Sequence, residues 1–382
     1  MRAVSILAGL LAAFYCPVAL GVTFQWSNVG NPMNDADDTG VGRVAHAYRI
    51  SKYEVTNGQY VEFLNAVDPT GQNSLELYSS LMSSGTMGGV LRDSVAENGS
   101  KYKTKQGRES NPVVYVSFFD AMRFVNWLAN GQGDATTESG VYVIDNGLSE
   151  VRATNAKYFL PTDNEWYKAA FHKNDGVTGN YWDYPTSSNA RPYSDNPTNF
   201  DASDLTNVAN FKTSDGLANG FNDGFALTGV ATFENTVNYL TDVGAYADAV
   251  SPYGTFDQAG NVWEWVEGVN RGRDNILRRV VRGGSWDYGA SALHVTVPGT
   301  ADLPAIQDFN IGFRVASVPE TTSVASALLA AAQLVLSTAR TRDRSSLVRK
   351  PSRPDRRSLV RRFTSYGNAP ERIAESQQVA DG

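Results

Sequence analysis

Few side chains in this sequence have the type and spacing that a catalytic centre requires. The 382-residue chain contains one cysteine, Cys16, and three histidines, His46, His172 and His294. The histidines are scattered and lack the spacing of a metal site, and a lone histidine is usually structural. No Ser-His-Asp order and no glycine-rich phosphate loop stands out. The residues themselves therefore do not indicate thiolate, imidazole or phosphate-binding chemistry.

Oxygen donors are more plentiful, and many of them lie in one irregular region. From Asn174 to about Gly260 the chain loses hydrophobic periodicity and is rich in Asn, Asp, Gly, Ser and Thr. Irregular stretches of this length in a compact domain are usually functional or held by ions. Carboxylate and carbonyl oxygens are the ligands that calcium prefers. On spacing alone, however, Asp and Asn in loops mostly form turns.

The N-terminus has the order of a secretory signal peptide. Arg2 supplies a positive charge, an apolar stretch follows, and Ala19-Leu20-Gly21 forms a cleavage site between small residues. A buried N-terminal helix is the alternative, which Pro17 disfavours. Residues 1–21 are therefore predicted to be a signal peptide, so the exported protein is expected in the periplasm, on the cell surface or outside the cell. Without Cys16 it has no disulfide, and metal ions commonly replace disulfides in restraining loops.

The C-terminal part divides into an apolar segment and a basic tail. Val318-Pro319-Glu320 precedes an apolar run over 324–339 and then Arg340, an order that resembles a bacterial Pro-Glu-Pro sorting signal. Residues 318–340 are thus a possible sorting or anchor segment that retains the protein at the membrane or cell surface, or else an ordinary terminal helix. Residues 341–382 have few apolar side chains to offset the entropy of ordering, and we expect a disordered tail.

The charge of the chain separates its body from this tail. Residues 340–382 hold 11 Lys+Arg and 5 Asp+Glu, whereas the rest of the chain holds 22 and 35. An acidic body argues against nucleic acid as a partner and is compatible with divalent cations. The basic tail could bind acidic polymers or form a solvated charge run. The hydrophobic fraction of 42% excludes a wholly disordered protein.

Three helices are predicted from the same kind of start signal. Capping boxes or their close relatives begin at Thr56, Ser117 and Thr162, and each precedes apolar residues at helical spacing. Short strands are expected at 279–281 and 312–316. Together with the long irregular region, these elements predict one loop-rich α+β domain over residues 22–317.

Six short motifs occur in one order within this domain. They are Tyr53–Asn57 (YEVTN), Asn111–Val114 (NPVV), Leu160–Trp166 (LPTDNEW), Ala259–Trp265 (AGNVWEW), Arg282–Trp286 (RGGSW) and Ile311–Arg314 (IGFR). Their combination resembles the formylglycine-generating enzyme (sulfatase-modifying factor) family, and the resemblance covers essentially the whole exported domain. It implies a loop-rich fold related to C-type lectins and stabilised by calcium.

The resemblance also implies an activity whose key residues are missing here. Members of the family oxidise a sulfatase cysteine to formylglycine with oxygen and a copper ion held by two cysteines. Those cysteines lie three and eight residues after the serine of the RGGSW motif, where this chain has Tyr288 and Leu293. Neither side chain can replace a soft thiolate pair or form a mixed disulfide, so copper is not expected. Trp263 and Ser285 of the family's pocket are retained, more as packing and loop-fixing residues than as catalytic ones.

The calcium chemistry of the family is expected to carry over. One site is implied around two carboxylates with main-chain carbonyls between them, and a second around an Asn and an Asp-Gly-Phe unit. The implied ligands of the first are Asp257, Gly260, Val262 and Glu264, and those of the second are Asn210, Phe211, Asp223 and Phe225.

Three functions remain open from the sequence. The first is a non-catalytic, calcium-stabilised binding module, a pseudoenzyme of the bacterial cell envelope, with a peptide or glycan ligand near Trp286, Tyr288 and His294. The second is a formylglycine-generating oxidoreductase that works by an altered route. The third is a helper that grips sulfatase precursors without modifying them. Binding without turnover would separate the first and third from the second.

Overall fold

A computed structural model describes residues 21–319 of the chain. The predicted signal peptide, sorting segment and basic tail therefore lie outside the described residues, apart from Gly21 and the first residues of the sorting segment. Within the described part, no helix has both the length and the apolar character to cross a membrane.

The helices begin where the sequence predicts them. Thr56, Ser117 and Thr162 cap α1, α3 and α4, and in each case the side chain at the third helical position bonds back to the main chain of the cap. A short helix, α2, was not predicted from the sequence. The bounds are α1 Asn57–Val67, α2 Ser80–Ser84, α3 Phe118–Ala129 and α4 Asp163–Phe171, with 3₁₀ turns η1 Leu205–Asn207 and η2 Ala290–Leu293.

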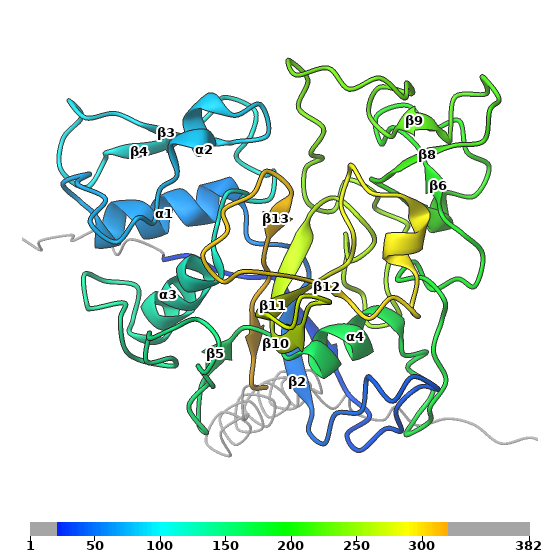
Figure 1. The fold of residues 1–382 in the computed structure, drawn as a ribbon, viewed down its shortest axis with the longest axis horizontal. Helices are drawn as coiled ribbons and strands as arrows, with labels where there is room; N and C mark the ends of the chain where they lie inside the picture. Colours follow the sequence, from blue (N-terminus) through cyan, green and yellow to red (C-terminus); the bar gives the residue numbers. More distant parts are fainter. Residues whose placement is uncertain (1–20, 320–382) are drawn as a thin grey trace, which may run out of the picture. The chain divides into compact units, whose positions relative to one another are not determined.

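The strands form two four-stranded sheets and three small two-stranded ones, so the α+β class is confirmed. In Figure 1, β10, β11 and β13 lie centrally, with α1 and α3 to one side and β6, β8 and β9 to the other. The first sheet has the order β1 (Trp26–Val29), β2 (Tyr48–Ser51), β14 (Ala316–Ser317) and β5 (Tyr158–Phe159). The second has the order β12 (Thr300–Asp302), β11 (Leu277–Arg282), β10 (Trp263–Arg271) and β13 (Ile311–Gly312). The pairs are β3 (Val90–Arg92) with β4 (Tyr102–Thr104), β6 (Tyr193–Ser194) with β7 (Val208–Ala209), and β8 (Lys212–Ser214) with β9 (Asp223–Phe225).

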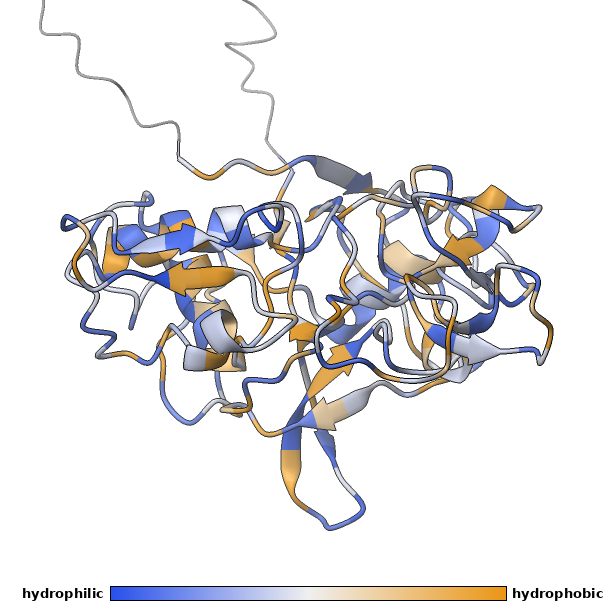
Figure 2. Cartoon of the chain, turned by 90° about the horizontal axis from the view of Figure 1, so that it is seen from above, coloured by the Kyte–Doolittle hydropathy of each residue, from blue (hydrophilic) through white to orange (hydrophobic). Residues whose placement is uncertain are grey.

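The single strand predicted over 312–316 is wrong, because the chain changes sheets within it. Strand β13 pairs in parallel with β10, whereas β14 pairs with β2 and β5. The residues between them are buried, and the Arg314 side chain is completely enclosed. One extended apolar run in the sequence therefore serves both four-stranded sheets. The strand predicted at 279–281 lies within β11, whose hairpin with β10 projects from the body in Figure 2.

The irregular region from 174 to 260 holds only the short strands β6 to β9 and one 3₁₀ turn. Its loops are fixed by side chains that bond to the main chain. Asp195 Oδ2 accepts the N–H groups of Asp201 and Ala202, each at 2.8 Å. Asn207 Nδ2 donates to the carbonyl of Ala190 at 3.1 Å. Such bonds satisfy main-chain groups that regular structure would otherwise pair.

The main core joins α1 and α3 through aromatic rings. Phe124 lies 5.3 Å from Phe63, 5.6 Å from Trp127 and 6.2 Å from Tyr60 between ring centroids. Phe313, in the segment that crosses between the sheets, contacts the same Phe124 ring edge-on at 5.3 Å. These residues are buried. The helical pair is therefore anchored directly to the junction of the two sheets.

Glu165, in the capping box of α4, is also the centre of an ion-pair network. Its carboxylate accepts from Thr162 N–H at 2.7 Å, from Arg152 at 2.6 Å and from His46 at 2.9 Å. Burial alone would raise the pKa of Glu165, but the His46 and Arg152 contacts lower it to about 2. Because the pKa is depressed in the folded state, the carboxylate stabilises the fold above its unfolded pKa and loses this effect as the pH falls.

We expect Glu165→Gln to lower the free energy of unfolding by roughly 2–4 kcal/mol at pH 7, because the folded protein lowers the pKa of this carboxyl to about 2. The difference between variant and wild type should shrink as the pH falls from about 5 towards 2. Urea unfolding of the wild type and the variant between about pH 5 and pH 2 measures this difference in the free energy of unfolding. A destabilisation that stays constant with pH would contradict the assignment.

Candidate functional site

Leu293 and Tyr288, at the two positions where the resemblance implies copper-binding cysteines, have different surroundings. Leu293 ends η2, is buried, and packs in a small apolar cluster with Phe211 and Ala259. Its Cδ1 also lies over Gly284 of the RGGSW motif, 2.8 Å from where a Cβ on that glycine would stand. Tyr288 is instead 46% exposed. Position 293 thus holds a buried apolar side chain, and position 288 holds a phenol at the surface.

The retained pocket residues Trp263 and Ser285 make structural contacts. The Tyr288 ring meets Trp263 edge-on with centroids 5.2 Å apart. The Ser285 hydroxyl donates to Asp287 Oδ1 at 2.6 Å, and the Asn310 amide donates to the same oxygen at 3.0 Å. These bonds hold the loop after β11 against the segment before β13.

A cavity of about 430 Å³ lies beside this loop and includes Trp286 and Asp287 among its walls. Its aromatic floor is formed by stacked rings. Trp286 and Tyr239 stack at 4.8 Å with an angle of 8° between their planes, and Phe233 stacks on Trp286 at 6.0 Å. Phe233 is 49% exposed although its neighbours are buried. We call this cavity the aromatic cleft; its walls are Thr86, Met87, Tyr115, Lys212, Phe225, Phe233, Trp286, Asp287 and Phe309.

Polar groups stand at the edge of the aromatic cleft. The Lys212 ammonium lies 4.2 Å from the centroid of the Phe225 ring, a cation–π distance. The Trp286 indole N–H is buried and has no hydrogen-bond partner in the described part of the chain. His294, expected nearby, instead packs edge-on against Tyr184 at 5.1 Å and lines a separate small pocket with Leu293. The cleft therefore combines ring faces with one cation, one carboxylate and a free donor.

The residues of the first implied calcium site surround a buried cluster of charges. Glu264, in β10, receives two hydrogen bonds from Arg314 at 2.5 and 2.6 Å and one from the Trp166 indole at 2.7 Å. Asp257 Oδ2 accepts the Gly244 N–H at 2.6 Å. Gly260 has a φ of 90° and donates its N–H to the Gly283 carbonyl at 2.8 Å, while Val262 is buried in the core.

Glu54, which the sequence analysis did not select, belongs to the same cluster. Its Oε1 accepts from the Asn261 amide at 3.2 Å, whereas Oε2 is buried without a partner in the described residues. Burial and the neighbouring Asp257 raise the pKa of Glu54 well above its usual range. Burial also raises the pKa of Asp257 to about 6. Three carboxyl groups thus share one guanidinium, that of Arg314, which bonds directly to Glu264, and burial disfavours the charged forms of the other two.

Of the second implied site, Asp223 and Phe225 lie in β9, whereas Asn210 and Phe211 lie between β7 and β8. Asp223 Oδ2 accepts the Gly220 N–H at 2.9 Å, while its Oδ1 is buried without a partner in the described residues. The carbonyls of Phe211 and Phe225 accept from Ser194 at 2.5 Å and from Gly229 at 2.8 Å. Asn210 donates to the Tyr239 carbonyl at 2.9 Å.

The two implied sites meet at one contact. Asn210 and Gly260 form an isolated parallel bridge, and Asn261 N–H donates to the Asn210 carbonyl at 2.8 Å. Within residues 21–319, no group of three or more His, Cys, Asp or Glu side chains has the arrangement of a metal site. Any cation held here would therefore depend on main-chain carbonyls as well as carboxylates.

We expect Arg314→Leu to lower the free energy of unfolding by about 3–5 kcal/mol, because it leaves the buried Glu264 carboxylate uncompensated. The double variant Arg314→Leu/Glu264→Gln should recover part of that loss, since it removes the unpaired charge. Urea unfolding of the wild type and both variants checks the expectation. Equal destabilisation of the single and double variants would show that Glu264 does not depend on Arg314.

Comparison with known proteins identifies the family. The sulfatase-modifying factor enzyme 1-like domain matches residues 27–318. Among solved structures, CarF is 19% identical with a TM-score of 0.45, covering 78% of this chain and 99% of CarF. PvdO from Pseudomonas aeruginosa is 17% identical with a TM-score of 0.37, covering 78% of this chain and 92% of its own. No curated protein matches the sequence. Because the family match spans most of the chain, the protein belongs to the sulfatase-modifying factor (formylglycine-generating enzyme) domain family.

Proposed function

We propose that this protein is an exported, non-catalytic binding module of its family, stabilised by calcium. The observation that carries the proposal is the filling of the family's thiol positions. Leu293 is a buried apolar plug, and Tyr288 is a phenol packed on Trp263. Neither provides a soft ligand for Cu(I) or a thiol for exchange with a substrate cysteine. A domain that keeps the family fold but lacks the copper-binding thiols can still bind a ligand.

The aromatic cleft is the proposed ligand site, and a peptide or a glycan is the proposed ligand. Exposed ring faces stack on sugars or on apolar side chains, and Phe233 offers such a face. Lys212 and Asp287 at the edge of the cleft provide one group of each charge to orient a polar ligand. The unpartnered Trp286 N–H adds a buried donor. A ligand oxygen that accepts from it would remove the cost of an unsatisfied group.

Calcium is proposed because carboxyl oxygens of the implied sites are buried without a hydrogen-bond donor in the described residues, namely Glu54 Oε2 and Asp223 Oδ1. At the first site, Asp257 and Glu54 share a single guanidinium with Glu264. At the second, Asp223 has a buried oxygen without a partner in the described chain. A bound divalent cation would favour the ionised forms of these carboxyl groups and take their oxygens as ligands, with carbonyls of Gly260 and Val262 completing the first site. Calcium, when bound, would hold loops rather than take part in a reaction.

Export and surface retention complete the proposal. The sequence at residues 1–21 supports secretion, and the segment at 318–340 supports retention at the membrane or cell surface. A loop-rich domain without disulfides, working outside the cytoplasm, is the kind of protein that gains most from bound calcium.

Chelation should destabilise the protein if calcium is bound. Saturating calcium at about 100 times its dissociation constant adds about 2.7 kcal/mol, which raises the melting temperature by several degrees in a domain of this size. Asp257→Asn and Asp223→Asn should each reduce this shift, because each removes a charged ligand. The exposed Asp38→Asn serves as the matched control and should leave it unchanged. Differential scanning calorimetry with calcium and with EGTA measures the shift, and an unchanged melting temperature would contradict the proposal.

A binding screen of the purified protein against glycans and envelope-protein peptides tests the cleft. Phe233→Ala should weaken the ligand found by about threefold to tenfold, which corresponds to the loss of one aromatic stack. Leu217→Ala, at another exposed apolar side chain, should have no effect.

The same preparation, incubated with Cu(I), oxygen and a peptide carrying the sulfatase cysteine motif, should show no conversion of thiol to aldehyde by mass spectrometry. Aldehyde formation would overturn the non-catalytic proposal and favour oxidation by an altered route. Binding of the peptide without conversion would favour a helper that grips sulfatase precursors.

A further inference from the structure

The outer part of the β10–β11 hairpin differs in charge from the rest of the domain. We call residues 269–278 the hairpin tip; it contains Arg271, Arg273 and Arg278 and one acid, Asp274. The other residues between 21 and 319 hold 18 Lys+Arg against 33 Asp+Glu. A short basic element therefore stands on an acidic domain.

The hairpin tip is a paired ribbon that extends away from the body. Arg271 lies opposite Leu277 in the ladder, and the Gly272 N–H donates to the Ile276 carbonyl at 2.9 Å. Figure 2 shows the hairpin projecting beyond the other strands. At about 3.3 Å per residue, the four residues after Val269 carry the turn roughly 13 Å outwards.

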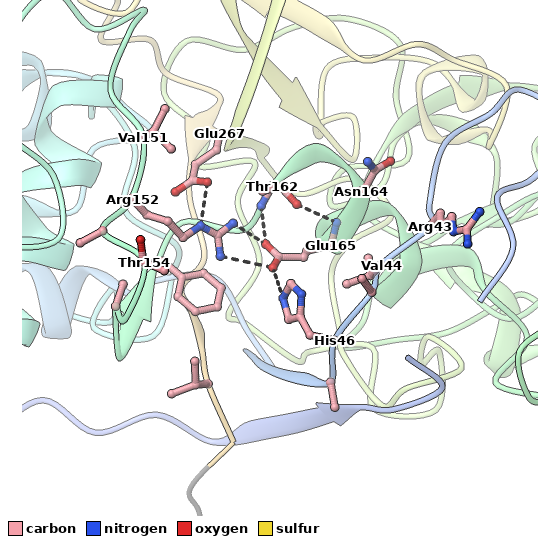
Figure 3. Close-up of a pocket in the computed structure, with 16 residues that line it drawn as sticks. Arg43, Val44, His46, Val151, Arg152, Thr154, Thr162, Asn164, Glu165 and Glu267 are labelled. Carbon is pink, nitrogen blue, oxygen red and sulfur yellow. Dashed lines mark hydrogen bonds and ion pairs between the residues drawn. The ribbon is translucent and has the colours of Figure 1, made fainter. Parts of the chain in front are cut away.

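The base of the hairpin is fixed to the body on both strands. Glu267 of β10 accepts from Arg152 at 2.8 Å, a contact that Figure 3 shows beside α4. Arg279 of β11 is buried and donates to the carbonyls of Gly147 at 2.6 Å and Glu150 at 3.1 Å. The hairpin tip is therefore held on a rigid base.

Two of the three arginines of the hairpin tip keep an uncompensated charge. Arg278 donates to both oxygens of Asp274 at 2.6 Å, so this pair is neutral. The Arg271 guanidinium donates to the neutral Asn275 carbonyl at 2.9 Å, and Arg273 is exposed in the turn. No carboxylate within residues 21–319 forms an ion pair with Arg271 or Arg273.

The negative charge of the domain lies further from the end of the hairpin. The next acid in the ladder, Asp302 of β12, lies opposite Arg279 at the base. Charges in water are screened over about 8 Å at physiological ionic strength. Because the turn stands roughly 13 Å beyond Val269, its arginines can approach an anionic surface while most of the acidic domain stays beyond this screening length.

Apolar side chains stand beside the arginines on both faces of the hairpin tip. Val269 is 46% and Ile276 48% exposed. Since faces alternate along a strand and opposed residues share a face, Val269 lies on the face of Arg271, and Ile276 lies on the face of Arg278. A flat protein surface would cover one face, whereas a layer that surrounds the hairpin tip covers both.

The main chain limits how deeply such a layer can be entered. Strand β13 pairs with β10 at residues 263 and 264, and β12 pairs with β11 at residues 279–281, so both outer edges of the hairpin tip are unpaired in the described chain. Unpaired N–H and C=O groups are not tolerated in hydrocarbon. The polar headgroup layer of a membrane satisfies them and offers an apolar boundary to short aliphatic side chains.

We propose that the hairpin tip docks end-on on an anionic lipid surface. Arg271 and Arg273 contact the negatively charged headgroups, and Val269 and Ile276 enter the boundary between headgroups and acyl chains. The contact is weak and reversible, because it uses two charges and two aliphatic side chains. It does not depend on the aromatic cleft, on calcium or on the segment at 318–340.

A fluorophore attached to the hairpin tip tests the contact. The full chain with Cys16→Ser and Asn270→Cys is labelled with an environment-sensitive dye and mixed with phosphatidylglycerol–phosphatidylcholine vesicles. The emission should rise and shift to shorter wavelength, because the dye enters the headgroup layer. Pure phosphatidylcholine vesicles should leave the emission unchanged. The matched control carries the dye at Leu217→Cys, an exposed position outside the hairpin, and should not respond.

The dye position separates the hairpin tip from the basic tail, which is present in every labelled protein. Tail binding alone would not transfer a dye at position 270 into the headgroup layer. No response at 270, or equal responses at 270 and 217, overturns the proposal. An equal response to soluble polyglutamate in place of vesicles also overturns it and identifies an acidic protein as the partner.

Variants of the dye-labelled protein separate charge from apolar insertion. Arg271→Gln/Arg273→Gln should weaken vesicle binding about 25-fold, a factor of about five for each arginine. Val269→Thr/Ile276→Thr should weaken it by about threefold to tenfold, since it keeps β-branched side chains but removes apolar surface.

The matched control for charge is Arg43→Gln/Arg191→Gln, which removes two exposed arginines outside the hairpin and should bind as the parent does. Equal weakening by both arginine pairs, or full binding by the threonine variant, overturns the proposal. Melting temperatures confirm that each variant is folded.

Discussion

The buried ion pair of Arg314 and Glu264 is the interaction on which the rest of this domain depends. Arg314 follows β13 and Glu264 lies in β10, and both side chains are fully enclosed. The guanidinium also donates to carbonyls of Ser51, Lys52 and Phe256. The carboxylate in turn accepts from Trp166 of α4. One charged pair therefore joins both four-stranded sheets, a helix and a loop, and breaking it would leave a charge without solvent.

The contacts that hold the RGGSW loop, from Ser285 and Asn310 to Asp287, do not involve the side chains of Tyr288 or Leu293. Leu293 contributes apolar burial at its position. Residues other than cysteine at positions 288 and 293 are therefore compatible with the fold.

Charged groups are paired differently in different parts of the domain. In the cluster of Glu54, Asp257 and Glu264, the Arg314 guanidinium bonds directly to Glu264, and burial raises the pKa values of the other two carboxyl groups. Beside α4, Arg152 bonds to the carboxylates of both Glu165 and Glu267. In the aromatic cleft, ring faces lie beside one lysine and one aspartate.

The sequence by itself predicted the starts of α1, α3 and α4, the family, and the absence of cysteine at positions 288 and 293. A capping box such as Thr162 with Glu165 spans one helical turn, so its hydrogen bonds depend only on neighbours in the chain. The order of the six motifs and the identities of Tyr288 and Leu293 also need no structure. Only the tertiary structure decided which distant residues become partners. Arg314 forms an ion pair with Glu264, Glu54 lies close enough to Asp257 for their charges to interact, and Tyr239 stacks on Trp286. These partners are far apart in the chain, and their contacts exist because the packing of whole sheets and loops brings them together, which no local pattern encodes.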